Sequence, residues 1–276
     1  MYSTHQILEE CRRFDPYLRV SDSITVGQGW QLSSTLAQNP EHLAYILAQM
    51  AHRYHCADLR YLTGLLLNMH LHSILTLGMF SIWQMNCLPF LGMDSIAFQY
   101  DLQGQLRQLC LLKPTVYTLA DDVTNIDALR VDDIRVLWEY LREMIVAHAE
   151  WLVPALHQHV QAAGQKWGQR ALWLMCADQV VSQAIYIAKR LGKTADLDHV
   201  VKLLVQYPNS PLCAKTGVFI VEAQGRREYF VKRSSCCFIY LAQDAHGHAL
   251  QRCRTCPYFS REVRQQLLTD YVRRQS

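Results

Sequence analysis

Four cysteines near the C-terminal end of the sequence have the types and the spacing of a metal or cluster site. Cys236 and Cys237 form a doublet, and after fifteen intervening residues Cys253 and Cys256 follow with two residues between them. Four thiolates in so short a segment can hold an iron–sulfur cluster or a zinc ion. The first would indicate a redox protein and the second a structural module, so the choice decides the functional class.

The doublet favours a cluster over a zinc ion. Adjacent residues of a regular strand point to opposite faces, so Cys236 and Cys237 can reach one site only where the backbone has left the strand. Structural zinc sites usually take their thiolates from pairs with two to four intervening residues. A [2Fe–2S] cluster has two ligands on each iron, which relaxes that demand. Zinc, free thiols and a redox-active disulfide stay open as alternatives.

The simplest assignment puts the doublet on one iron and the Cys253-x-x-Cys256 pair on the other, although which thiolates share an iron is open.

The run Gly225–Tyr240, followed by Cys253-Arg-Thr-Cys-Pro257, resembles the C-terminal signature of the FhuF-like ferric-siderophore reductases. That family has a doublet shortly after a basic residue, a tyrosine three positions beyond it, and a Cys-x-x-Cys. The resemblance implies that the four cysteines bind a [2Fe–2S] cluster that passes single electrons to iron held by a siderophore.

The chain departs from the family pattern in two places. The interval between the doublet and the Cys-x-x-Cys is longer than usual, so Leu241–Arg252 is expected to contain an extended loop with Gly247 and two histidines at its tip. Upstream, Ala171–Asp178 resembles a family segment in which Leu-Trp is usually followed by Gly-Asn. Here Leu174 and Met175 stand at those positions.

Four basic residues flank the cysteines, namely Lys232, Arg233, Arg252 and Arg254. We expect them to raise the potential of a bound cluster and to attract anionic chelates or an acidic electron donor. The alternative is a solvated charged rim without a role. No dinucleotide-binding or other catalytic motif is present, which predicts a separate electron donor such as a ferredoxin or a flavoprotein reductase.

Two alternative functions follow from the same residues. One is a non-enzymatic module that binds a ligand or a protein and whose four cysteines hold a structural zinc ion. The other is an iron–sulfur sensor, in which the cluster reports on iron or redox state without turnover. Neither alternative requires a different set of cysteines.

The composition indicates a soluble, folded protein. Of the 276 residues, 50% are hydrophobic and 18% charged, and the mean hydropathy is −0.04. The net charge of +3 is too small to indicate nucleic-acid binding. The N-terminal residues show no apolar core of a signal peptide, so we expect a cytoplasmic protein with its cysteines reduced or bound to metal.

One segment has the length and apolarity of a membrane span. Tyr61–Met93 contains no acidic or basic residue, and Leu62–Trp83 is about as long as a spanning helix. Polar side chains such as Asn68 and His70 interrupt it, at a density that would be costly in lipid. We therefore predict a central helix buried in the protein, with weak peripheral contact at the inner membrane face left open.

Helix signals fill most of the first 206 residues. Ser3 and Gln6 form a capping box before a first short helix, and Asn39-Pro40 marks a second helix start. Pro154 is expected to kink or interrupt a later helix. Further helices are predicted over 132–164, 167–191 and 196–206.

Two β-hairpins and a terminal helix complete the prediction. Residues 96–100 alternate in polarity before a Gln103-Gly104 turn, and β-rich runs flank Gln224-Gly225. Ser260 caps the last helix.

We therefore predict an α+β fold with a mainly helical body. Residues 1–206 are expected to form that body, with small β-hairpins and the siderophore-binding region. Residues 207–276 are expected to hold a hairpin, the cysteine-rich cluster-binding segment and the terminal helix.

Overall fold

The fold is organised around α4 (Leu59–Met85), a long apolar helix that is buried along most of its length. The computed structural model describes residues 2–24, 29–119, 128–244 and 246–275. Buried side chains lie all around this helix rather than on one stripe, which is the pattern of a helix enclosed on all sides. The prediction of a central buried helix is confirmed.

Two helices, α4 and α6 (Gln169–Leu191), are long and apolar enough to cross a membrane by length and composition. In the folded protein, 78% of the most apolar window of α4 and 67% of that of α6 are buried. The protein itself covers these surfaces, as it covers the core helices of soluble proteins.

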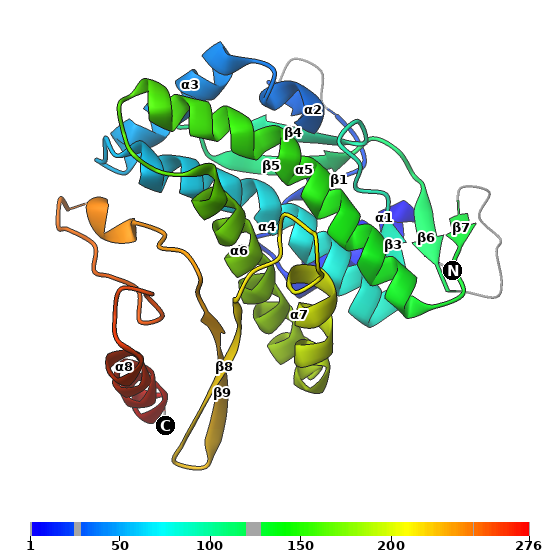
Figure 1. Cartoon of the computed structure of the whole chain (residues 1–276). Helices are drawn as coiled ribbons and strands as arrows, with labels where there is room; N and C mark the ends of the chain where they lie inside the picture. The colour runs from blue at the N-terminus through cyan, green and yellow to red at the C-terminus, as the bar shows by residue number, and fades with distance from the viewer. Residues whose placement is uncertain (1, 25–28, 120–127, 245, 276) are drawn as a thin grey trace.

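Helices from both sides of the sequence pack against α4 (Figure 1). Its neighbours are α1 (Thr4–Phe14), α3 (Pro40–Arg53), α5 (Ile134–Ala162) and α6, while α7 (Leu197–Val205) covers α5 and α6. The short helices are α2 (Ser33–Leu36), η1 (Thr194–Asp196) and η2 (Ile239–Leu241).

A kink or an interruption was expected at Pro154, and the interruption is wrong because α5 runs through this proline. Proline removes the hydrogen bond to the carbonyl four residues earlier. That carbonyl belongs to Glu150, an exposed residue.

In the part of the chain that the structure describes, two small sheets and one hairpin accompany the helices. The first sheet has the order β1-β5-β4-β2, with β1 parallel to β5 and the other pairs antiparallel. The second has the order β3-β6-β7. These strands are β1 (Val20–Ser21), β2 (Trp30–Leu32), β3 (Cys87–Pro89), β4 (Ile96–Tyr100), β5 (Leu106–Leu111), β6 (Val116–Thr118) and β7 (Ala128–Arg130). With about 52% helix and 16% strand, the chain has an α+β fold.

The C-terminal part contains the hairpin of β8 (Gly217–Ala223) and β9 (Arg226–Lys232) and the terminal helix α8 (Arg261–Arg274). Gln224 and Gly225 form its turn with φ values of 52° and 74°, as a two-residue hairpin loop requires. The hairpin packs on α6, and α8 packs on β8 (Figure 1). The segment that carries the cysteines joins β9 to α8.

The predicted helix caps are present as hydrogen bonds. The Ser3 hydroxyl accepts from the Gln6 amide at 3.3 Å, and the Gln6 side chain accepts from the Ser3 amide at 2.8 Å. Asn39 Oδ1 accepts from the His42 amide at 2.9 Å. Gly192 ends α6 in the left-handed region with φ of 70°.

A buried group of three polar side chains joins α2, α4 and α5. His148 Nε2 donates to the Leu91 carbonyl at 2.8 Å, so Nδ1 is the acceptor for the Ser33 hydroxyl at 2.7 Å. His70 Nε2 lies 3.2 Å from the same hydroxyl. Both histidine side chains are almost fully buried, and burial lowers the pKa of His148 to about 4 and that of His70 well below its ordinary value.

We expect acid to destabilise the protein through these histidines. An unfolded histidine titrates near 6.5, so the unfolded chain binds more protons than the folded one between about pH 6.5 and 4, and stability falls as pH falls through that window. For His148 the loss is about 3 kcal/mol, from 1.36 kcal/mol per pKa unit. Urea unfolding across this range measures it. His148→Gln should flatten the slope and the exposed-site control His199→Gln should not; equal slopes in all three proteins would contradict the prediction.

Candidate metal centre

The cysteine doublet lies in a loop, as the geometric argument required. The strand β9 ends at Lys232, and Cys236 and Cys237 follow outside the β-ladder. Phe238, the next residue, is in the left-handed region with φ of 53°, and its amide donates to Cys236 Sγ at 3.4 Å. This tight turn changes the chain direction directly after the doublet and points an amide back at the first sulfur.

The four sulfurs form two close pairs. A side-chain hydrogen bond joins Cys237 and Cys253; it lowers the pKa of Cys237 and raises that of Cys253. Burial raises the pKa of Cys236 to about 11, and Cys256 adds to the rise through its charge and a side-chain hydrogen bond. Each pair therefore joins one cysteine of the doublet to one of the Cys-x-x-Cys, and these contacts between thiols do not decide which thiolates would share an iron.

Two pairs of thiolates match the number of protein ligands of a [2Fe–2S] cluster. In the described ranges, no three His, Cys, Asp or Glu side chains form a group that could hold one metal ion. Zinc requires all four ligands about 2.3 Å from one centre, whereas each iron of a [2Fe–2S] cluster takes two thiolates. By donor type and by pairing, the four cysteines fit such a cluster.

A buried carboxylate on α6 fixes the segment before the doublet. Asp178 is 1% exposed, and its two oxygens accept from the amide of Ser234 at 2.8 and 3.1 Å and from that of Ser235 at 2.9 Å. The Ser235 hydroxyl also donates to the Ala171 carbonyl at 3.2 Å. Burial raises the pKa of Asp178, and the hydrogen bonds oppose that rise. The loop is thus attached to the helix at two points, which are about two turns apart along its length.

Arg233 connects the doublet side of the site with the Cys-x-x-Cys side. Its Nε donates to Thr255 Oγ1 at 3.2 Å, and the Thr255 hydroxyl lies 3.9 Å from Cys253 Sγ. The guanidinium charge acts to lower the pKa of both Cys237 and Cys253. A fixed positive charge here stabilises thiolates and would partly offset the negative charge of a bound cluster.

The other three predicted basic residues are spread around the site. Arg252 lies over the rings of Tyr240 and Tyr258, at 4.9 and 5.6 Å from their centroids. Arg254 is turned towards α8, where its guanidinium is 4.5 Å from the Tyr271 ring. Lys232 is exposed at the end of β9. Only Arg233 is therefore coupled directly to the cysteines, while the others form the rim.

Sequence reasoning missed the aromatic residues that cover the turn after the doublet. The Trp167 ring meets the Phe238 ring edge-on at 5.5 Å, and the Arg60 guanidinium lies 4.8 Å from the same ring. Tyr61, the residue after Arg60 on α4, is close enough to Cys237 to interact with it electrostatically. Phe238 lies inside the segment that resembles the family signature and could have indicated an aromatic contact there. Its partners Arg60 and Trp167 come from distant parts of the chain, so the sequence did not identify them.

The loop between the doublet and the Cys-x-x-Cys is a small hairpin. Gln243 and Ala249 form an isolated antiparallel bridge, and the Gln243 amide donates to the Tyr54 carbonyl at 3.2 Å. Asp244 accepts from the amides of His246 and His248 at 2.8 and 2.9 Å. These contacts order the extended loop that was predicted over Leu241–Arg252, of which Ala245 lies outside the described residues.

The sequence matches no protein-family model and no curated protein. The resemblance of the cysteine segment to the ferric-siderophore reductases therefore stays a prediction.

Proposed function

We propose that this protein is a ferric-siderophore reductase whose four cysteines hold a [2Fe–2S] cluster. The observation that carries the proposal is the crosswise pairing of Cys236 with Cys256 and of Cys237 with Cys253 in a segment attached to α6. Two thiolate pairs on a well-anchored loop suit a cluster with two irons. The resemblance of Gly225–Tyr240 to the reductase signature supports the same chemistry.

The residues around the cysteines suit exchange of electrons with partners outside the protein. Cys237 and Cys253 are only half-buried, and Arg252 and Tyr258 beside them are exposed. A bound cluster would supply one electron at a time. Iron(III) in a siderophore is held by hard oxygen donors, and iron(II) is held far more weakly, so reduction releases the metal. Arg233 and the rim arginines would favour approach of an anionic chelate.

A cytoplasmic site and a separate donor belong to the same proposal. The segment 207–276 carries 11 lysines and arginines against 5 aspartates and glutamates. A surface of this charge suits an acidic electron-transfer protein such as a ferredoxin or a flavoprotein reductase. Reduced donors and released iron(II) both belong to a reducing compartment, which is where unpaired thiols persist.

Anaerobic purification tests the proposal against zinc and against a sensor. The protein should be brown and should give an electron-paramagnetic signal after one-electron reduction. A colourless protein with stoichiometric zinc would overturn the cluster. Rapid mixing of the reduced protein with a ferric chelate should then oxidise the cluster and form iron(II). A stable reduced cluster in that experiment would indicate a sensor instead.

We predict that Arg252 and Arg254 steer the substrate. Changing both to glutamine should slow ferric-chelate reduction about tenfold at low ionic strength and remove most of its salt dependence, because surface charge acts mainly on association. Stopped-flow rates over a salt series measure this. Changing Arg12 and Arg13 on α1 removes the same charge elsewhere and is the matched control. If the double variant had the same rates as the control at every salt concentration, Arg252 and Arg254 would have no role in steering and would be part of a solvated charged rim.

A further inference from the structure

The hairpin of β8 and β9 and the helix α8 form a pocket of about 320 Å³ beside the cysteine segment. Thr255 lines this pocket and also belongs to the Cys-x-x-Cys, where its hydroxyl lies 3.9 Å from Cys253 Sγ. A cavity of about 150 Å³ is enough for benzene. The pocket therefore adjoins the candidate metal centre and has room for one substituted aromatic ring, while the rest of a larger ligand would stay outside.

The alternation of β9 turns Lys232 towards α8. In the antiparallel register, Phe230 is opposite Phe219 and Lys232 is opposite Gly217. Residues two apart on a strand share a face, so Lys232 lies on the same face as Phe230. The Phe230 ring meets the Tyr271 ring of α8 edge-on at 6.0 Å. This face of the hairpin is therefore the one that α8 covers, and its last position carries an ammonium group opposite a residue without a side chain.

The beginning of α8 supplies two further cations. Arg261 and Arg264 both line the pocket. The N-terminal end of a helix carries a partial positive charge that disfavours cations, so the stability of the helix does not account for these two residues. Glu262, between them, is exposed. Within the described ranges, no ion pair involves Lys232, Arg261 or Arg264.

The inner wall of the pocket is apolar. Both strands and α8 contribute to it, through Val218, Phe219, Val231 and Leu268. None of the described residues that line the pocket is acidic. Lys232 and Arg261 are exposed, which places their charges at the opening. An apolar wall with cations at the opening suits a flat apolar group that carries anionic oxygens at one end.

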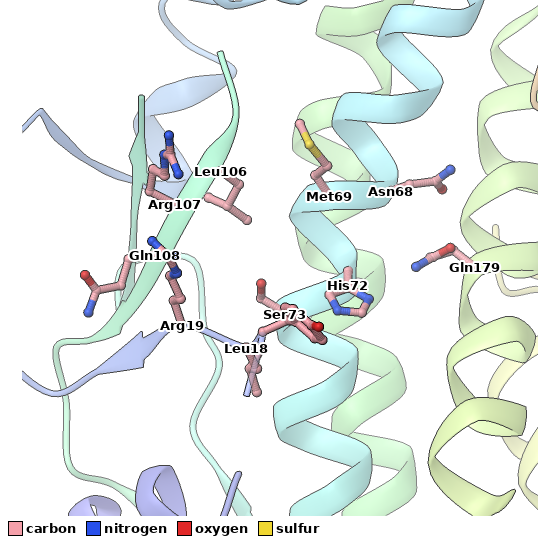
Figure 2. Close-up of a pocket in the computed structure, with 11 residues that line it drawn as sticks. Leu18, Arg19, Asn68, Met69, His72, Ser73, Leu106, Arg107, Gln108 and Gln179 are labelled. Carbon is pink, nitrogen blue, oxygen red and sulfur yellow. The ribbon is translucent and has the colours of Figure 1, made fainter. Parts of the chain in front are cut away.

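A cleft elsewhere in the molecule lacks this convergence of groups. It has a volume of about 290 Å³ and lies between α4, α6 and the sheet edge of β1 and β5 (Figure 2). Figure 2 shows Arg19 and Arg107 on one side of α4 and His72 and Gln179 on the other. None of the described residues that line it belongs to the segment 207–276. The cleft is therefore separate from the cysteine segment, which the pocket at α8 adjoins through Thr255.

We propose that the pocket at α8 receives one catecholate arm of an anionic ferric chelate, with the ring on the apolar wall and the oxygens beside Lys232, Arg261 and Arg264. This inference rests on the proposed reductase function and specifies its substrate class. Three catecholate arms leave a ferric complex with net negative charge, whereas three hydroxamate arms neutralise it and bring no aromatic ring. The catecholate complex therefore matches both the wall and the cations.

Gallium(III) complexes test the binding without electron transfer, because gallium(III) has the charge and nearly the size of iron(III) and is not reduced under these conditions. In calorimetry, the anaerobically purified protein should bind the gallium complex of a tris-catecholate chelator at least tenfold more tightly than that of a tris-hydroxamate chelator. Equal or weaker binding of the tris-catecholate complex would overturn the inference. If the protein then still reduced ferric hydroxamates, the reductase function would stand. Tight binding of the gallium tris-catecholate without reduction of the ferric complex would support the pocket and contradict the reductase function alone.

Two double variants on one helix locate the binding. Arg261→Gln with Arg264→Gln should weaken binding of the gallium tris-catecholate about tenfold or more, because charge-assisted contacts are lost. The melting temperature should stay the same or rise, since cations leave the N-terminal end of the helix. The control, Arg273→Gln with Arg274→Gln, removes the same charge from the other end of α8 and should change affinity by no more than about twofold. Equal affinity in the two double variants would show that overall charge governs binding and would refute the site.

Discussion

Replacing Asp178 with alanine is expected to destabilise the protein by about 3 kcal/mol or more and to release the loop that carries the cysteine doublet. The carboxylate is buried and accepts from the amides of Ser234 and Ser235. Alanine would leave both amides without a partner in a buried place, at about 1–3 kcal/mol for each. Urea unfolding measures the stability, and hydrogen exchange of these two amides measures the release of the loop.

The control for this experiment is another aspartate. Asp198 on α7 has a side chain that is 81% exposed, so Asp198→Ala should change stability by no more than about 0.5 kcal/mol. Asp178→Asn keeps an oxygen acceptor and should fall between the two. If Asp178→Ala unfolded like Asp198→Ala and kept slow exchange at both serines, the carboxylate would not be the anchor described above.

Replacing Cys237 with serine is expected to remove the cluster and with it the reduction of ferric chelates. Positioning residues around a metal site typically change its affinity by about 10–100-fold, and loss of a ligand should cost more. Anaerobically purified Cys237→Ser should therefore lack the brown colour and the electron-paramagnetic signal. Cys253→Ser should behave in the same way, because its sulfur belongs to the same pair as Cys237.

A fifth cysteine in the same segment supplies the control. Cys213 is half-buried and precedes β8, away from the doublet and the Cys-x-x-Cys in sequence. Cys213→Ser should keep full colour, signal and turnover. A Cys237→Ser protein that kept both signal and turnover would show that Cys237 is no ligand. Full iron content with an altered signal would instead indicate that serine oxygen replaces the sulfur.

Local signals made most of the helices and both long hairpins predictable. The Ser3 capping box, the Asn39 cap and the Gln224-Gly225 turn depend on residues within a few positions of each other, and all three are present. The parallel pairs were not predictable in the same way. β1 is two residues long and joins β5 across most of the N-terminal half, so no periodicity marks it.

The four candidate ligand cysteines stand out by type and spacing, but the contacts between them could not be predicted. The pairing depends on the left-handed backbone at Phe238, and phenylalanine is not a residue type that marks this conformation. The anchor was missed for a different reason. Asp178 ended a segment already noted for its resemblance, yet its partners lie 56 and 57 residues further along the chain. No sequence pattern near Asp178 or near the two serines indicates the contact between them.

The enclosure of α4 has a consequence for synthesis on the ribosome. This helix emerges before α5 and α6, which later cover much of it. At about 5–20 residues per second, its apolar surface waits some seconds for the partners that shield it. During that interval the unshielded helix has the length and apolarity of a membrane span, and apolar surface exposed in this way is prone to aggregate.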